Sequence, residues 1–472
     1  KLRTSIKNFN LWKEWYLYIF FIGMIIRAIN FYSLLPSTFD SIFFKLIGIS
    51  GVLLLGIDFI IKFNKRKVTY NILLIAYMVI LVITSFVHKE YGLGENLKTI
   101  MWAILQYFLI YQFAFENSDN KRFFKRISWG FIYSWFVLVS MSMVLFFGKF
   151  GYEKYYNARH RIRIGFLESR LFGTFSDINN AAIASLVVIV LILFYLYNKK
   201  VTGLNKIIFL INLPLQFIYI VLSGSRSTYV VSIIIVAISS FIVVLKRNGT
   251  KKDLKNYILA IVSSIGSVLI LFALFNATKI LFQELLPHLK EINFFNFTER
   301  HKELMNNSQH INNTQTPDNT LVRKDVAENT DISNARITIW KSAWEIFKTS
   351  WLIGVSPKNV VSYAQSIIPD GYIAKVGIAI HNAYLNVLTS TGILGIIPFM
   401  AFLIKSFVLN VYRIIYNKCI GKDYHFVYCL VILSYALYAA LNNELVYENT
   451  VGTFVFWLFL GRVNSKNNSS YF

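Results

Sequence analysis

The chain has 472 residues, and its composition excludes an ordinary soluble protein. Hydrophobic residues make up 56% and charged residues 15%, against about 45–50% and about 25% in soluble domains. Because a soluble fold of this length could not bury so much apolar surface, the composition predicts a polytopic membrane protein. The net charge of +24 comes from short basic runs between apolar segments, which is typical of membrane topology rather than of nucleic-acid binding.

Apolar segments that could cross a bilayer recur along the chain. A crossing helix needs about 20 mostly apolar residues, and open strands cannot cross lipid. We therefore predict an all-α fold with about twelve transmembrane helices, near residues 15–35, 42–61, 68–87, 100–115, 129–148, 179–197, 206–223, 228–245, 257–276, 384–404, 425–441 and 446–461. The first segment is long enough to remain as a membrane anchor, so we expect no cleaved signal peptide.

The basic residues indicate the orientation. One set of alternating loops, together with both termini, contains 26 basic residues and five acidic ones. Cytoplasmic loops hold such an excess of Lys and Arg, so we expect both termini in the cytoplasm and the other loops outside. The predicted organisation is helices one to nine in residues 1–276, a large extracytoplasmic loop in 277–383, helices ten to twelve in 384–463, and a cytoplasmic tail in 464–472.

The large external loop has two parts. Its 11 basic and 10 acidic residues nearly balance, as expected of a translocated segment. The stretch 293–334 is rich in Asn, Thr and Gln without periodicity, which predicts a mobile tip. Apolar residues then recur at helical spacing, which predicts an amphipathic helix near 336–348 on the membrane surface.

Arginines in the external segments depart from the expected charge pattern. The loop 149–178 is basic although short external loops normally are not. Its cluster at 159–163 is explained as well by a solvated patch or by pairing with lipid headgroups as by a functional site, but Arg170 opens a compact turn that leads into the sixth span.

Two further arginines stand near the outer face. Arg226 follows Gly224, which lets the backbone approach a ligand; an interfacial anchor is the alternative. Arg336 lies at a helix N-terminus, where its charge opposes the helix dipole unless an anion binds there. Since a guanidinium holds phosphate oxygens in a fork, Arg170, Arg226 and Arg336 together predict a phosphate or diphosphate ligand.

His381 lies at the outer end of the tenth span. A histidine with a pKa near 6.5 can take a proton from a hydroxyl at neutral pH, although a lone histidine often only marks the interface. Gly392 and Gly395 favour the first interpretation, because they allow close packing by a neighbouring helix that would fix the histidine. Cys419 and Cys429 are the only cysteines, so no Cys-rich metal site is expected.

These motifs resemble the O-antigen ligase and polymerase family, the Wzy and WaaL type of membrane glycosyltransferases. The most specific match is His381-Asn382, nine residues, then Gly392-Ile-Leu-Gly395. Further matches are Gly224-Ser-Arg226-Ser, Arg336 with Ile339-Trp340, Trp351-Leu-Ile-Gly354, and Gly173-Thr-Phe with Asn179-Asn180. The resemblance covers about 165–460, and it departs from the family at Asp177-Ile-Asn179, where the family often has Asn-Pro-Asn.

The resemblance implies a GT-C-like fold in the bacterial cytoplasmic membrane. It implies transfer of a glycan from undecaprenyl diphosphate to an acceptor hydroxyl on the outer face, without a cofactor or a metal. His381 would be the general base, and Arg170, Arg226 and Arg336 would bind the diphosphate. Apart from the resemblance, Glu444 and Glu448 lie at the predicted outer turn between the last two spans, where they could orient His381 or bind sugar hydroxyls. Asn382 and Asp177 are further candidate acceptor-binding or orienting residues. The implied partners are lipid-linked oligosaccharide, membrane lipids, a flippase and a chain-length regulator, with no nucleic acid.

Within this family we favour a polymerase of capsular or O-antigen-like polysaccharide, with a ligase as the alternative. The Asn-rich stretch 293–334 is unlike a compact domain for docking an acceptor. A lipid-linked oligosaccharide flippase predicts charged residues deep in several spans, whereas the notable polar residues here gather at the outer face, which favours a one-sided catalyst. Arg27 and Asp58 do fall within predicted spans, but Lys62 is close enough to pair with Asp58. A scaffold or receptor would leave the arginines and His381 unexplained.

Overall fold

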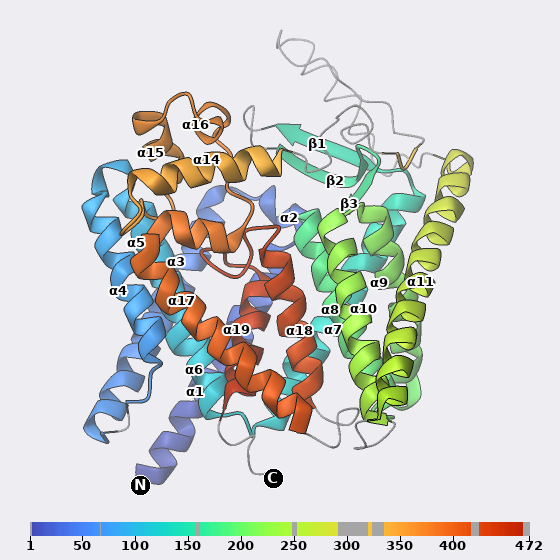
Figure 1. Cartoon of the computed structure of the whole chain (residues 1–472), viewed down its shortest axis with the longest axis horizontal. Helices are drawn as coiled ribbons and strands as arrows, with labels where there is room; N and C mark the ends of the chain where they lie inside the picture. Colours follow the sequence, from blue (N-terminus) through green and yellow to red (C-terminus); the bar gives the residue numbers. More distant parts are fainter. Residues whose placement is uncertain are drawn as a thin grey trace.

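The computed structural model describes residues 2–66, 68–155, 161–247, 253–290, 320–322, 335–416 and 424–465. The longer helices run side by side as a bundle (Figure 1). In chain order they are α1 (Leu2–Arg27), α3 (Ser37–Asn64), α4 (Ile72–Val87), α5 (Leu93–Ile104), α7 (Lys121–Phe147), α8 (Ile178–Tyr197), α9 (Gly203–Ser223), α10 (Arg226–Arg247), α11 (Leu254–Leu285), α17 (Ala383–Tyr416), α18 (Tyr424–Ala439) and α19 (Val451–Asn464).

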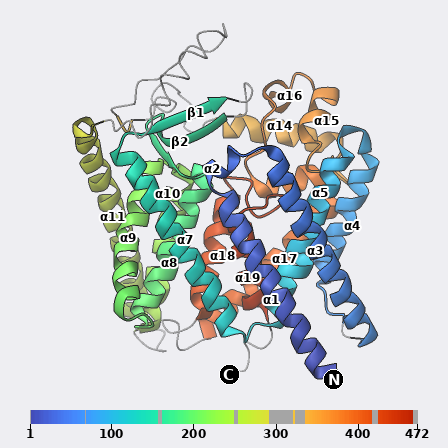
Figure 2. The same ribbon diagram turned by 180° about the vertical axis from the view of Figure 1, so that it is seen from behind.

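Short elements join and cover these helices. They are α2 (Asn30–Ser33), η1 (Lys89–Tyr91), the π-helical η2 (Leu105–Tyr111), α6 (Gln112–Glu116), β1 (Gly151–Tyr155), β2 (Arg161–Leu167), β3 (Arg170–Gly173), η3 (Leu286–His288), α14 (Arg336–Thr349), α15 (Val360–Ile367) and α16 (Tyr372–Val376). The strands and α14–α16 lie at one end of the bundle, and both chain termini lie at the other (Figures 1 and 2).

The predicted all-α polytopic membrane fold is confirmed. Within the described residues, seven helices are long and apolar enough to cross a membrane, namely α3, α7, α8, α9, α10, the α11–η3 segment and α17. The helices α4, α18 and α19 are shorter and apolar. Each of the twelve predicted segments overlaps a described helix, while the number of crossings stays a prediction.

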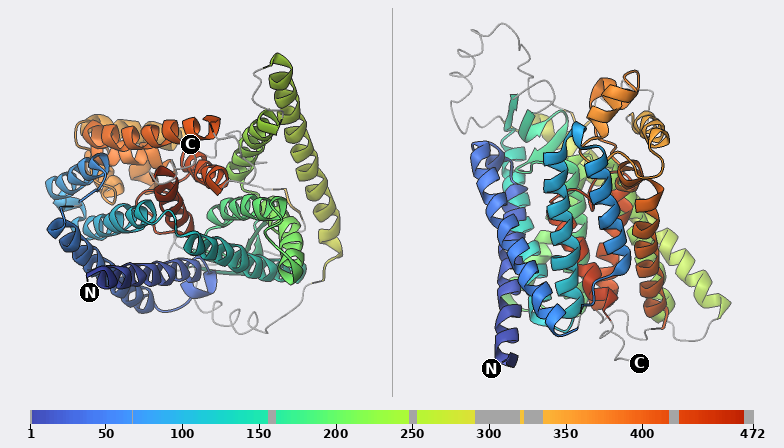
Figure 3. Two further views of the ribbon diagram at one scale, coloured as in Figure 1. Left: turned by 90° about the horizontal axis from the view of Figure 1, so that it is seen from below. Right: turned by 90° about the vertical axis from the view of Figure 1, so that its left-hand side faces the viewer.

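Helices with similarly apolar sequences differ in how far they are buried. The helix α8 is packed on most sides against α7, α9, α10 and α18, and small residues such as Ala181 and Ala184 allow this close approach. The helix α11 packs mainly on α10 and runs along the periphery of the bundle (Figure 3). Few of its residues are buried, so most of its apolar side chains are exposed. Outward apolar surface of this extent fits a lipid environment.

The segment 149–178, expected as an external loop, contains a three-stranded antiparallel sheet in the order β1–β2–β3. The alternation Arg161-Ile-Arg-Ile164 has the period of a strand, and the two isoleucines are buried. Arg161 forms ion pairs of 2.7 Å with Glu153 and with Glu168. These arginines therefore join the strands, whereas Arg159 and His160 lie outside the described residues.

A buried ion-pair cluster lies nearer the end that holds the termini. Asp58 of α3 pairs with Lys62 one turn later, as the sequence predicts, and also with Lys13 of α1 at 2.7 Å. Lys62 in turn lies 2.7 Å from Glu116 at the end of α6. Each charge in this cluster has a partner of opposite sign, which offsets the cost of burial and joins three helices.

The segment predicted as the large external loop begins later than expected. Helix α11 continues past residue 276 to Leu285, and η3 follows it. The predicted mobile tip at 293–334 lies outside the described residues apart from 320–322. Helix α14 occupies the range in which an amphipathic helix is predicted, and it packs on α16 and α17 through Ile339, Ala343 and Ile346.

Candidate functional site

Arg170 begins strand β3 and joins two helix ends. Its Nε donates to the carbonyl oxygen of Ser223 at 2.8 Å, and its Nη2 donates to Oδ1 of Asn179 at 3.0 Å. Ser223 is the last residue of α9, and Asn179 lies in the first turn of α8. Arg170 therefore has a positioning role at this end of the bundle, in addition to the ligand-binding role predicted for it.

The motif around Arg226 forms the break between two helices. Gly224 has φ 61°, a left-handed conformation that ends α9 with little strain, and α10 begins two residues later at Arg226. Arg226 is half-buried, and its neighbours Ser225 and Ser227 are buried. The sharp reversal thus puts Arg226 in the first turn of α10, at the same end as Arg170.

Asp177 and Asn382 are both helix caps. Oδ1 of Asp177 accepts hydrogen bonds from the backbone N–H groups of Asn179 and Asn180, at 2.8 and 2.9 Å, and starts α8. Oδ1 of Asn382 accepts one from the N–H of Leu385 at 3.0 Å and starts α17. The turn in which the sequence departs from the family pattern is therefore an Asp-capped helix start.

Asn442 connects the histidine segment with the arginine segment. The N–H of Ala383 donates to the carbonyl oxygen of Asn442 at 2.9 Å, and Nδ2 of Asn442 donates to Oγ of Ser227 at 3.3 Å. Ala383 is two residues after His381, and Ser227 follows Arg226. The starts of α10 and α17, distant in sequence, are thus brought to one place by the loop between α18 and α19.

The electrostatic surroundings of His381 connect it with two other predicted residues. Burial lowers the pKa of His381 below its ordinary 6.5, the charge of Arg336 lowers it further, and Asp177 acts in the opposite direction. Arg336 is the first residue of α14, after Ala335 rather than after a capping side chain. Because the neutral form is favoured, His381 can accept a proton at neutral pH.

His381 also has an uncommon backbone conformation, with φ 53°. A residue other than glycine is rarely left-handed, and such strain persists only where surrounding contacts hold it. Here the cap made by Asn382 and the bond between Ala383 and Asn442 fix the chain on one side of the histidine. Position 381 is therefore tightly defined.

Gly392 and Gly395 were expected to let a neighbouring helix pack closely, but the contacts at these two positions are different. Helix α17 is interrupted at Gly392, where φ is 62° and ψ is −164°. A Cβ atom there would lie 2.4 Å from the carbonyl of Leu352, so Gly392 lies against backbone of the turn 351–354. A Cβ atom at Gly395 would instead lie 2.2 Å from Oγ1 of Thr391 in the same helix. Backbone hydrogen bonds join the turn to the helix break; in one of them the N–H of Ile393 donates to the carbonyl oxygen of Trp351.

Gly392→Ala is therefore expected to destabilise the protein by about 1–3 kcal/mol, because the left-handed backbone and the contact with Leu352 both oppose a methyl group. Thermal unfolding in detergent measures the effect. Gly266→Ala in α11 is the control, since its Cβ atom would meet open space. Equal stability of the two variants would contradict this account of the helix break.

Glu444 is coupled electrostatically to Asp177 rather than directly to His381. It is 3% exposed in the loop between α18 and α19, and its Oε1 accepts a hydrogen bond of 2.5 Å from Oγ1 of Thr450. Burial raises the pKa of Glu444 to about 8, with smaller opposing contributions from its hydrogen bonds. Among the described carboxylates, Asp177 rather than Glu444 acts electrostatically on His381.

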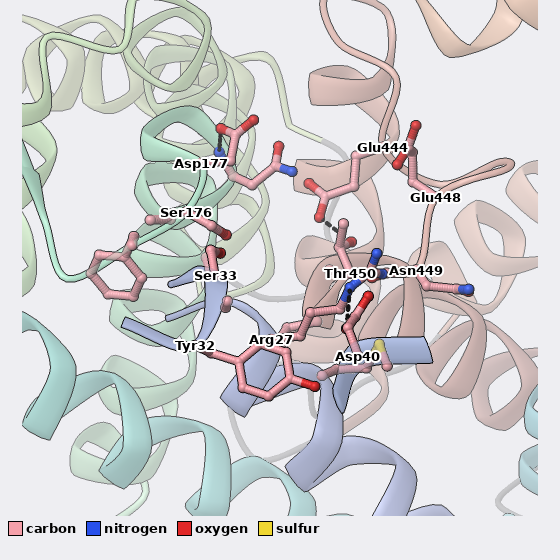
Figure 4. Close-up of a pocket in the computed structure, with 18 of the residues that line it drawn as sticks. Arg27, Tyr32, Ser33, Asp40, Ser176, Asp177, Glu444, Glu448, Asn449 and Thr450 are labelled. Atoms are coloured by element: carbon pink, nitrogen blue, oxygen red, sulfur yellow. Dashed lines mark hydrogen bonds and ion pairs between the residues drawn. The ribbon is translucent and has the colours of Figure 1, made fainter. Parts of the chain in front are cut away.

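A cavity of about 910 Å³ lies beside these residues. It is bounded by the α1–α3 corner, the start of α8 and the segment 444–452 (Figure 4). Asp177, Glu444 and Glu448 belong to its lining, as does Arg27, whose Nη1 donates to the carbonyl oxygen of Asn449 at 3.1 Å. The sequence pattern did not single out Asp40, which lies 3.8 Å from Arg27. The available signal was that these two residues of opposite charge stand on either side of Pro36, where the helix breaks.

No group of three or more His, Cys, Asp or Glu side chains suited to a metal ion is present in the part of the chain that the structure describes. The polar groups around Asp177 and His381 instead include arginines, carboxyls and amides. Such a set can bind anions, accept a proton and form hydrogen bonds with hydroxyl groups. It could act on a phosphorylated, hydroxyl-rich ligand.

The fold and these groups define an integral membrane protein with a polar candidate site at one end of its helical bundle. Residues 211–400 match the family model described as O-antigen ligase. This match confirms the predicted resemblance to the O-antigen ligase and polymerase family over that part of the chain. No curated protein matches the chain.

The family match gives the function at a coarse level. The match supports glycan transfer by a membrane enzyme, and the family implies lipid-linked oligosaccharides as the class of substrate. Arg226, Arg336, His381 and Asn382 lie within the matched residues, while Arg170, Asp177 and Glu444 lie outside them. The roles of the individual residues are matters of proposal.

Proposed function

We propose that the protein polymerises a capsular or O-antigen-like surface polysaccharide. It transfers an undecaprenyl-diphosphate-linked glycan to a hydroxyl group of another lipid-linked repeat unit. The observation that carries this proposal is that His381 lies within electrostatic range of Arg336 and Asp177, while Asn442 connects its segment with that of Arg226. A proton acceptor and guanidinium groups are thus available at one end of the bundle.

In this mechanism His381 removes the proton from the acceptor hydroxyl. The oxygen attacks the anomeric carbon of the donor, a new glycosidic bond forms, and the bond from that carbon to the diphosphate breaks. Arg226 and Arg336 bind the departing diphosphate and stabilise its negative charge, and Arg170 binds it while holding α8 and α9 together. No cofactor takes part in this scheme.

Transfer to a different acceptor, as in a ligase, is the second candidate within the same chemistry. The Asn-rich segment 293–334 favours the polymerase, because its composition is unlike a compact domain for docking such an acceptor. A flippase that delivers the donor and a regulator of chain length are the partners that this function requires.

We place the enzyme in the bacterial cytoplasmic membrane with its site on the outer face and both termini inside. The concentration of basic residues in alternating loops supports this orientation. Lys341 is exposed on α14. In a background without Cys419 and Cys429, Lys341→Cys is therefore expected to react with a membrane-impermeant maleimide on intact cells. Lys199→Cys, in the turn after α8, is expected to react only after permeabilisation. The reverse pattern would invert the proposed topology.

Chain growth in membranes tests the function itself. Lipid-diphosphate repeat units are supplied to vesicles containing the protein, and the products are separated by size. Products with several repeat units support a polymerase, whereas transfer of one preformed glycan to a different lipid would indicate the ligase. Movement of intact lipid across the bilayer without new glycosidic bonds would instead favour a flippase.

A further inference from the structure

The cavity lined by Asp177 and Glu444 differs in charge from the arginine groups. Its lining includes four carboxyl groups, those of Asp40, Asp177, Glu444 and Glu448, and the cations Arg27 and Lys154. Arg27 already donates to the carbonyl oxygen of Asn449 and lies close to Asp40. A diphosphate in this cavity would face four carboxyl groups, which repel it wherever they are ionised, and Arg27 is already engaged, so the cavity is unsuited to the charged part of the donor lipid.

The lining nevertheless contains a polar atom that lacks a partner. Glu444 is 97% buried, and its Oε2 has no hydrogen-bond partner among the residues described. Figure 4 shows its carboxyl group directed across the cavity towards Asp177, while the other oxygen accepts the bond from Thr450. An unsatisfied buried carboxyl oxygen is costly, and a hydrogen-bonding ligand in the cavity would remove that cost.

The remaining lining fits a sugar. Tyr32, Trp135 and Phe175 belong to the lining, and the C–H face of a sugar ring can pack against aromatic side chains. Asn180, Asn449 and Thr450 add groups that both donate and accept hydrogen bonds. A sugar hydroxyl also donates and accepts, and about 910 Å³ is enough space for a short oligosaccharide.

The geometry points to this cavity as the binding site for the saccharide of the acceptor, with Glu444 as a hydrogen-bonding residue that contacts a sugar. The inference rests on the proposed function. Asp177 is the connecting residue, because it belongs to the cavity lining and also acts electrostatically on His381. An acceptor hydroxyl at that edge of the cavity would reach the proposed base, while the diphosphate of the donor stays with the arginines.

The retained proton of Glu444 strengthens this assignment. With a pKa raised by burial to about 8, its carboxyl group is largely neutral at pH 7 and can donate as well as accept a hydrogen bond. Asp177 caps α8 with Oδ1 and offers acceptor capacity. The cavity can therefore bind both the hydrogen and the oxygen of a sugar hydroxyl.

Binding measurements on the purified full-length protein in nanodiscs test this proposal. The two probes are undecaprenyl diphosphate without a sugar and the lipid-linked repeat unit extracted from the producing cells. Glu444→Ala is expected to weaken binding of the repeat unit about tenfold and to leave binding of undecaprenyl diphosphate unchanged. Glu444→Gln, whose amide still donates and accepts, is expected to retain most of the affinity. Glu95→Ala removes only an exposed ion pair with Lys98 and is the matched control.

A steric variant keeps the test valid if Glu444→Ala does not fold. Ser33, labelled in Figure 4, belongs to the cavity lining, so Ser33→Phe should exclude the sugar; Ser267→Phe in peripheral α11 is its control. Equal loss of both probes, or loss of neither, in Glu444→Ala and Ser33→Phe would overturn the proposal. The binding readout does not depend on turnover, so absence of chain growth would contradict the proposed polymerase without deciding the sugar site.

Discussion

Replacing His381 with alanine is expected to lower the rate of glycan transfer by about 10²- to 10⁴-fold, the usual contribution of a general base. The physical reason is that the acceptor hydroxyl cannot lose its proton as it attacks, while the lipid substrates can still bind. Burial and the charge of Arg336 keep His381 neutral and thus ready to accept that proton. The measurement is the initial rate of chain growth in vesicles that contain equal amounts of folded enzyme.

His288→Ala is the control, because His288 is exposed in η3, apart from the groups that surround His381. The affinity for undecaprenyl diphosphate should remain within about twofold of the parent in both variants. Undiminished chain growth in His381→Ala would remove this residue as the base. Since His381 has a left-handed backbone that alanine also tolerates poorly, His381→Asn is a second variant with a residue more suited to that conformation.

Replacing Arg336 with alanine is expected to lower the rate by about 10²- to 10³-fold, as for the loss of one donor that stabilises developing negative charge. Arg336→Lys keeps the charge but loses the fork that binds two phosphate oxygens, so it should recover only part of the rate. Lys341→Ala removes an exposed cation from the same helix and is the control. Rates near the parent value in Arg336→Ala would exclude its guanidinium from the reaction.

The pH profile separates this role from a structural one. A neutral histidine base makes the rate fall as the pH drops below the pKa of His381, which lies under 6.5. Arg336 lowers that pKa, so removing its charge raises the pKa and moves the acidic limb of the profile to higher pH. Arg336→Lys should leave the limb nearly in place. An unchanged limb in Arg336→Ala would mean that Arg336 and His381 are not coupled.

Helix starts illustrate what local patterns could and could not indicate. The pattern Asp177-Ile-Asn-Asn preceding an apolar run is typical of a capped helix start, and both Asp177 and Asn382 do cap helices. The strands at 151–173 were missed because apolar residues dominate the neighbouring spans and only the short Arg161–Ile164 alternation indicates a strand. The helix break at Gly392 depends on backbone contacts with residues 351–354, which spacing alone does not reveal.

The sequence by itself determined the membrane class, the helical fold, the family and the residue types available for chemistry. Those properties follow from composition, from the length of apolar segments and from short motifs, all of which are local in the chain. Only the tertiary structure decided that Asn442 joins the starts of α10 and α17, that Asp177 rather than Glu444 acts on His381, and that Arg27 and Asp40 help to line a cavity. The reason is physical: these relations depend on side-chain contacts and burial between segments up to about 400 residues apart, which helix packing fixes and local pattern does not.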